Sequence, residues 1–82
     1  MNLAANLKSA RIASNLTLDE VAKELNVGFP AIYKWENGIR VPNGVRLVQL
    51  ASLYHTTAEE LVNGKEGAWK YEQKIWINYN RH

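Results

Sequence analysis

The sequence predicts an all-α domain followed by a C-terminal β-strand. Apolar residues recur at helical spacing in five short segments up to residue 63, and from 69 to 79 they alternate at period two. A chain of 82 residues allows one domain with a modest core. We place the helical domain at residues 1–63 and a separate tail at residues 64–82, because Asn63-Gly64 is a helix-ending pair.

Composition predicts a folded protein, and the charge distribution gives little indication of its partner. The chain is 46% hydrophobic and 22% charged, so it should fold. Its tail holds four of the ten basic and two of the eight acidic residues, which leaves six of each up to residue 62. The helical part is therefore neutral, and charge alone gives little support for nucleic-acid binding.

Three features that the sequence lacks limit the kinds of site and the cellular location that we expect. The chain has no cysteine, which fits the reducing cytoplasm. Its apolar runs are shorter than the roughly 20 residues of a membrane span, so we expect no membrane association. His55 and His82 stand apart from other metal-ligating residues, so we expect no metal and no cofactor.

The first helix should run from a cap at Asn2 to about Ser14. Arg11 falls on its inner stripe, where a buried charge would need a partner, although a solvated surface arginine is the alternative. The apolar members of that stripe are Leu3, Leu7 and Ala10.

The next two helices make a helix-turn-helix unit. Thr17 and Glu20 stand at capping-box spacing before the apolar stripe of Val21, Ala22 and Leu25. Asn26-Val27-Gly28 breaks the pattern, and a second stripe, Ile32 and Trp35, ends at Asn37-Gly38. Two such helices joined by a short turn are typical of DNA-binding units, whose second helix fits a major groove.

Two more helices should complete the domain. Asn43 can cap a fourth helix after the loop that ends at Pro42, and Thr57 with Glu60 repeats the capping box for a fifth. Their inward residues should be Leu47, Leu50, Ala51 and Tyr54, then Leu61 and Val62.

Several of these residues stand together in a known pattern. Its central part consists of Leu16, Thr17, Ala22, Val27, Ile32 and the run Trp35-Glu36-Asn37-Gly38. Its outer part consists of Leu7, Arg11, Pro42, Leu47, Leu50, Ala51 and Leu61. Over residues 3–62 the chain therefore resembles the phage repressor and Cro type of helix-turn-helix, the lambda-repressor-like family. The resemblance implies a five-helix fold, double-stranded DNA as partner, and an ion pair between Arg11 and Glu36.

The resemblance also implies which residues meet DNA. Base edges would face Phe29, Pro30, Tyr33 and Lys34, since lysine can donate to guanine and Phe29 can pack on a thymine methyl. The phosphates of the DNA would contact the N-termini of helices and positively charged side chains. The candidates for phosphate contact are Thr17, Gly28, Asn37, Arg40, Asn43 and Arg46, some of which would cap helices in any case.

The sequence departs from the family pattern at two places. Leu18 stands where the family commonly has a glutamine that holds a phosphate, and Phe29-Pro30 opens the recognition helix where polar residues are usual. Proline also biases Phe29 away from helical geometry. These apolar residues could instead form a patch for a partner protein.

The tail has the pattern of a β-strand. A single strand after a helical domain has no partner in its own chain, and an unpaired edge seeks one. We therefore expect the strand to pair with that of a second chain across a two-fold axis, although it could fold back over its own core. Its alternating residues, the predicted dimerisation contacts, are Trp69, Tyr71, Ile75, Ile77 and Tyr79.

Together these patterns predict a homodimeric, sequence-specific DNA-binding regulator of transcription, as in phage or mobile-element switches. The alternative is an antirepressor or antitoxin that grips another regulatory protein through the same fold. An enzyme is not expected, because the sequence offers no paired-carboxylate site, nucleophile with a base, or phosphate loop.

Overall fold

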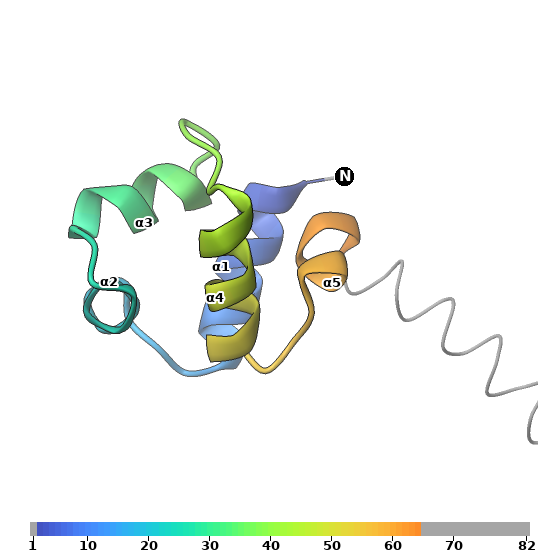
Figure 1. Ribbon diagram of the computed structural model, residues 1–82, viewed down its shortest axis with the longest axis horizontal. Helices are drawn as coiled ribbons and strands as arrows, with labels where there is room; N and C mark the ends of the chain where they lie inside the picture. Colours follow the sequence, from blue (N-terminus) through green and yellow to red (C-terminus); the bar gives the residue numbers. More distant parts are fainter. Residues whose placement is uncertain (1, 65–82) are drawn as a thin grey trace, which may run out of the picture.

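Five helices make up the part of the chain that the computed structural model describes, residues 2–64 (Figure 1). They are α1 (Leu3–Ala13), α2 (Leu18–Leu25), α3 (Phe29–Glu36), α4 (Gly44–Leu53) and α5 (Ala58–Asn63). The prediction of an all-α, five-helix domain is confirmed. The predicted β-strand at 69–79 lies outside the described residues.

Four of the five helices begin at a side-chain cap. An oxygen of Asn2, Thr17, Asn43 or Thr57 accepts a hydrogen bond from the backbone N–H three residues later, at 2.8 to 3.1 Å. Each bond satisfies one of the free N–H groups of a first turn and typically contributes about 1 kcal/mol. Helix starts were therefore readable from the sequence, and α3 is the exception.

Helix ends rely on left-handed residues. Asn26 closes α2 with φ 56°, and His55 takes the same φ just after α4, where a glycine would often stand. Gly38, with φ 72°, lies in the turn after α3. Glycine adopts this conformation at little cost, and asparagine and histidine are enriched in it among the other residues. At His55 the turn is closed by a hydrogen bond that the Thr56 N–H donates to the Ala51 carbonyl at 2.9 Å.

The core takes one large side chain from every helix. Leu7, Val21, Ile32, Leu50 and Leu61 are all at most 1% exposed. Burial of each such side chain stabilises the fold by roughly 1.5 to 3 kcal/mol. Around them α3 packs against α1 and α2, while α5 packs against α1 and α4. This packing leaves one side of α3 facing outward at the edge of the domain (Figure 1).

A side chain of α1 ties the last helix to the first. The Asn6 amide nitrogen donates to the Leu61 carbonyl oxygen at 2.8 Å, across 55 residues of sequence. This bond satisfies a carbonyl in the last turn of α5, a six-residue helix too short to be stable alone.

No helix within residues 2–64 has the length and apolar character to cross a membrane.

Candidate nucleic-acid interface

The outward side of α3 carries all four residues predicted to meet bases. Phe29 and Tyr33 are 44% and 48% exposed, and Pro30 and Lys34 are also exposed. Residues four apart are neighbours on a helix, so these four make two adjacent stripes. Ile32 is buried on the opposite side. Burial of Ile32 thus fixes which side of α3 faces outward.

The N-terminus of α3 differs from the other four. Gly28 occupies the cap position and supplies no side-chain oxygen, so a phosphate there could be bound only through backbone N–H groups. Pro30 is the second helical residue and has no N–H to offer. Phe29 nevertheless belongs to the helix, so the expected bias of a residue before proline is overridden here.

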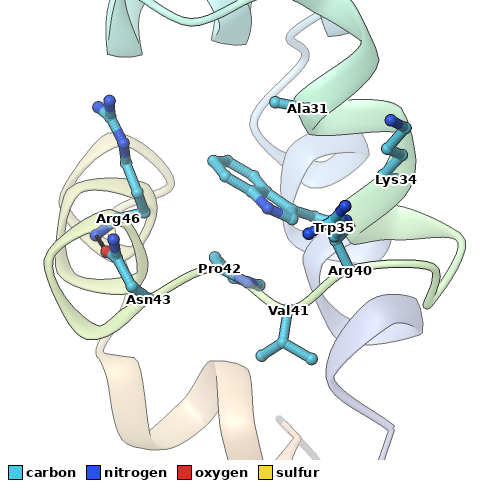
Figure 2. Close-up of a pocket in the computed structure, with 8 residues that line it drawn as sticks. All are labelled: Ala31, Lys34, Trp35, Arg40, Val41, Pro42, Asn43 and Arg46. Carbon is cyan, nitrogen blue, oxygen red and sulfur yellow. Dashed lines mark hydrogen bonds between the residues drawn. The ribbon is translucent and has the colours of Figure 1, made fainter.

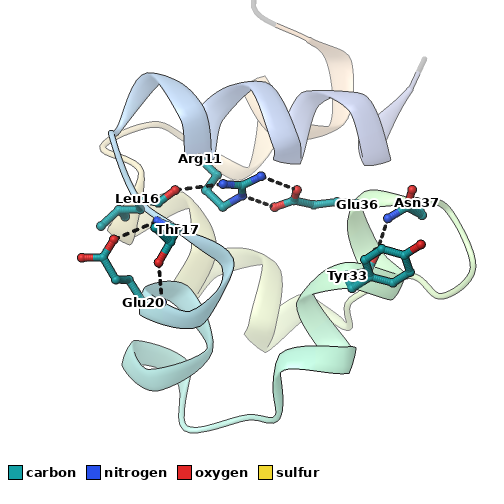
Figure 3. Close-up of polar contacts among 7 residues, drawn as sticks. All are labelled: Arg11, Leu16, Thr17, Glu20, Tyr33, Glu36 and Asn37. Carbon is teal, nitrogen blue, oxygen red and sulfur yellow. Dashed lines mark hydrogen bonds and ion pairs between the residues drawn. The ribbon is translucent and has the colours of Figure 1, made fainter.

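A bidentate ion pair fixes the other end of α3. The Arg11 guanidinium donates to Glu36 from Nε to Oε2 at 2.7 Å and from Nη2 to Oε1 at 3.0 Å, and Nη1 donates to the Leu16 carbonyl at 2.9 Å (Figure 3). The Arg11 and Glu36 side chains are only 12% and 4% exposed. The bond to Glu36 raises the pKa of Arg11, so the arginine stays charged. This contact holds α3, α1 and the segment before α2 in one arrangement.

A cleft beside α3 brings predicted base and phosphate contacts together. It measures about 440 Å³ and lies between α3, the α3–α4 loop and the first turn of α4 (Figure 2). Its lining residues are Ala31, Lys34, Trp35, Arg40, Val41, Pro42, Asn43 and Arg46. Three of these are basic, and none is acidic. Cations beside a helix N-terminus form an arrangement that favours a phosphate.

The basic residues of the cleft differ in how they are held. Arg46 Nη1 donates to the Leu25 carbonyl at 2.9 Å and to Gln49 Oε1 at 3.1 Å, which ties α4 to the end of α2. Lys34 and Arg40 are exposed, and their side chains make no hydrogen bond or ion pair with other described residues. Lys34 and Arg40 are therefore the cations free to meet an anion, while Arg46 also has a structural role.

Three further phosphate candidates are engaged as caps. Asn43 Oδ1 accepts from the Arg46 backbone N–H at 2.8 Å, and the Asn37 amide nitrogen donates to the Tyr33 carbonyl at 2.8 Å. Thr17 Oγ1 accepts from the Glu20 N–H at 3.1 Å and keeps its own hydrogen to donate. Figure 3 shows Thr17 and Asn37 on opposite sides of the Arg11–Glu36 pair. Capping and phosphate contact are compatible at each of the three.

Glu20 completes the capping box at the start of α2. Its Oε1 accepts from the Thr17 N–H at 2.9 Å, and this bond lowers the pKa of the Glu20 carboxyl.

The sequence missed the role of Trp35. Its helical stripe with Ile32 predicts an inward residue, yet the indole is half-buried and lines the cleft (Figure 2). Ala31 stands four residues earlier on the same side of α3 and also lines the cleft. That spacing does not reveal the cleft, because its opposite wall comes from the start of α4. The Arg46–Leu25 bond likewise had no signal in the sequence.

The apolar residues that depart from the family pattern do not all share one surface. Leu18 is partly buried and packs against the core, whereas Phe29 and Pro30 are exposed. A patch for a partner protein on this side therefore reduces to residues of α3. Within residues 2–64 no group of His, Asp and Glu side chains could hold a metal ion.

The chain is similar to known helix-turn-helix regulators of transcription. A helix-turn-helix family model (HTH_3) matches residues 7–61. The chain is 35% identical over 66 residues to the HTH-type transcriptional activator BcrR of Enterococcus faecalis, which covers 80% of this chain and 32% of that protein. It is 32% identical over 75 residues to the HTH-type transcriptional regulator ImmR of Bacillus subtilis (strain 168), covering 92% of this chain and 59% of that protein. The chain thus spans less than two thirds of either relative.

Proposed function

Because this chain belongs to the lambda-repressor-like helix-turn-helix family of transcriptional regulators, we propose that it binds a specific DNA site through α3 in the major groove. It would regulate transcription in the cytoplasm, as phage or mobile-element repressors do. The observation that carries this proposal is the cleft between α3 and α4, where an exposed helix side meets free cations and a helix N-terminus.

The two parts of this surface suit different tasks. Lys34 projects from the outward side of α3 and can donate to guanine O6 and N7, while Phe29 can pack on a thymine methyl and Tyr33 can reach a base or a phosphate. Arg40 and the start of α4 lie one loop away and suit the phosphate backbone. Phosphate contacts fix the register of α3, and base contacts select the sequence.

Phosphate contacts would flank α3 on two sides. Arg40, Asn43 and Arg46 line the cleft after α3, and Asn37 ends the helix itself. Thr17 caps α2, and Gly28 precedes α3 with exposed backbone. Contacts to the DNA backbone on both sides of α3 would orient this helix in the major groove.

A second copy of the chain would complete the binding site. One helix-turn-helix reads few base pairs, and two-fold partners can meet groove faces about 34 Å apart. We propose that the tail, through Trp69, Tyr71, Ile75, Ile77 and Tyr79, pairs two chains.

A protein partner is the second candidate. The observation that favours it is the exposure of Phe29 beside Pro30, where a DNA reader usually presents polar groups. On this reading the same side of α3 would grip another regulator.

The salt dependence of binding separates the two. Genomic fragments that the full chain retains would be selected, and the best would be labelled for mobility shift at several salt concentrations. With Arg40 and Arg46 on phosphates, the logarithm of the binding constant should fall with a slope of about −2 per chain against the logarithm of salt. Lys8→Ala, on the exposed side of α1, is the matched control and should bind like the wild type. Failure to retain any fragment would favour the protein partner.

A further inference from the structure

Two valines stand exposed on one side of α4. Val45 and Val48 are 69% and 61% exposed on the surface of the helix. They are spaced three residues apart, so they share one side of α4. The opposite side of α4 supplies Leu50 and Ala51 to the core. We call Val45 and Val48 the valine face.

An apolar groove continues from the valine face. It measures about 340 Å³ and lies between the end of α2 and α4. Leu25, Val48 and Leu53 give it apolar walls, and Glu24 is its only charged lining residue among those described. Contiguous apolar surface of this kind marks a contact site, whereas single exposed valines would not.

The remaining sequence contains a segment of matching chemistry. Residues 69–79 carry Trp69, Tyr71, Ile75, Ile77 and Tyr79 at alternate positions, and the residues between them are polar except Trp76. The tail holds four basic residues against two acidic ones, which complements Glu24. An extended segment of this pattern presents one apolar side and one mainly polar side.

The tail also begins in the right place. It follows Gly64 at the end of α5, and α5 packs directly against α4 (Figure 1). From Gly64 to residue 69 the extended chain spans up to about 17 Å. Because α5 packs against α4, this length lets residue 69 reach α4 of the same chain.

We propose that residues 69–79 dock on the valine face and the adjoining groove of their own chain. The apolar side of the segment covers Val45 and Val48, and its mainly polar side meets water. The edges of the segment stay free to pair with a second copy, so docking and dimerisation are compatible. This inference does not depend on DNA binding.

Cysteine pairs test the docking directly, because the chain has no cysteine of its own. Ile75→Cys would be combined in turn with Val45→Cys and Val48→Cys in the full chain. A disulfide forms only where two Cα atoms come within about 7 Å. Ile75→Cys with Lys8→Cys, on the exposed side of α1, is the control for random collision.

Mild oxidation followed by peptide mass mapping gives the readout. We expect at least one valine-face pair to form a disulfide within a single chain at least tenfold faster than the control pair. Equal rates for all pairs would overturn the proposal. A disulfide that joins two chains would also overturn it, in favour of a segment that docks on a second copy.

A second measurement guards against distortion by the cysteines. Deletion of residues 65–82 should lower the denaturation midpoint of the wild type, and should lower it less in a chain with Val45→Ser and Val48→Ser, since the docking surface is already lost. An equal effect of the deletion in both chains would contradict the contact.

Discussion

Among single residues, Arg11 shows how hydrogen bonds stabilise a charged side chain on the apolar stripe of a helix. Its guanidinium uses Nε, Nη1 and Nη2 on two acceptors, the Glu36 carboxylate and the Leu16 carbonyl. A buried guanidinium without such partners would be strongly disfavoured. The pair therefore fixes the position of α3 relative to α1, and through it the direction in which Lys34 points.

Removal of the carboxylate should leave this charge stranded. We predict that Glu36→Gln lowers the free energy of unfolding by roughly 3 to 5 kcal/mol, because the buried arginine loses its counter-charge. Chemical denaturation measures this change. Glu24→Gln, an exposed carboxylate on α2, should stay within about 0.5 kcal/mol of wild type. A midpoint for Glu36→Gln close to that of the wild type would refute the importance of the pair.

Tyr54 presents the opposite case, a buried polar group left unsatisfied. Its hydroxyl has no hydrogen-bond partner among the described residues, although the side chain is buried. Burial, and then the nearby Glu36 charge, raise the pKa of Tyr54 above its usual value of about 10. The folded protein thus keeps this proton at a pH where the unfolded chain loses it.

The sign of the pH effect follows. The stability that Tyr54 contributes is complete below about pH 10 and is lost as pH rises toward the folded pKa, by up to about 1.4 kcal/mol per pH unit. We predict that Tyr54→Phe lacks this component, and that at neutral pH it is at least as stable as the wild type. Denaturation curves from pH 8 to 11 measure both effects. Tyr33→Phe, which is exposed, should follow the wild type, and parallel curves for all three proteins would contradict the prediction.

At the scale of elements, α3 and the loop after it divide the proposed work on DNA. Lys34 lies on the helix, and Arg40 lies in the loop beside the cleft. Both side chains are exposed. Any difference between the effects of their substitutions on DNA binding should therefore come from the different positions of the two residues.

Alanine substitutions test this division. Lys34→Ala should relax the base preference at one operator position by about 1 to 3 kcal/mol. Arg40→Ala should weaken binding to all sequences alike and flatten the salt slope by about one unit. Binding to an operator and its single-base variants over a salt series measures both. Identical behaviour of the two mutants would mean that α3 is not the recognition helix.

For the whole molecule, the proposed dimer predicts that the helical domain does not work alone. The core of residues 2–64 takes a buried side chain from every helix, so it should persist without the tail. One domain by itself binds too weakly to select a site against a genome.

Deletion of residues 66–82 should therefore leave a folded, helical monomer that has lost most of its operator affinity. Sedimentation equilibrium and circular dichroism on both forms measure assembly and folding, and mobility shift measures affinity. A full-length chain that is monomeric at concentrations where it occupies DNA would rule out the dimer.

Local patterns in the sequence predicted where the helices lie. Caps at Asn2, Thr17, Asn43 and Thr57 and the stripes behind them act over three or four residues, so the sequence sufficed to predict all five helices, while the outward side of α3 was predicted from the family resemblance. The residues that line the cleft were also nominated in part, since Arg40 and Asn43 lie within one loop of α3.

Only the tertiary structure decided the rest, because contacts across more than twenty residues leave no local pattern. The Arg46 bond to the Leu25 carbonyl joins segments 21 residues apart and makes a candidate phosphate ligand part of the scaffold. Trp35 faces the cleft because the start of α4 stands opposite it, and no helical stripe records that neighbour. The contacts of such residues depend on which surfaces of the helices come together. That arrangement results from packing the whole domain around one small core.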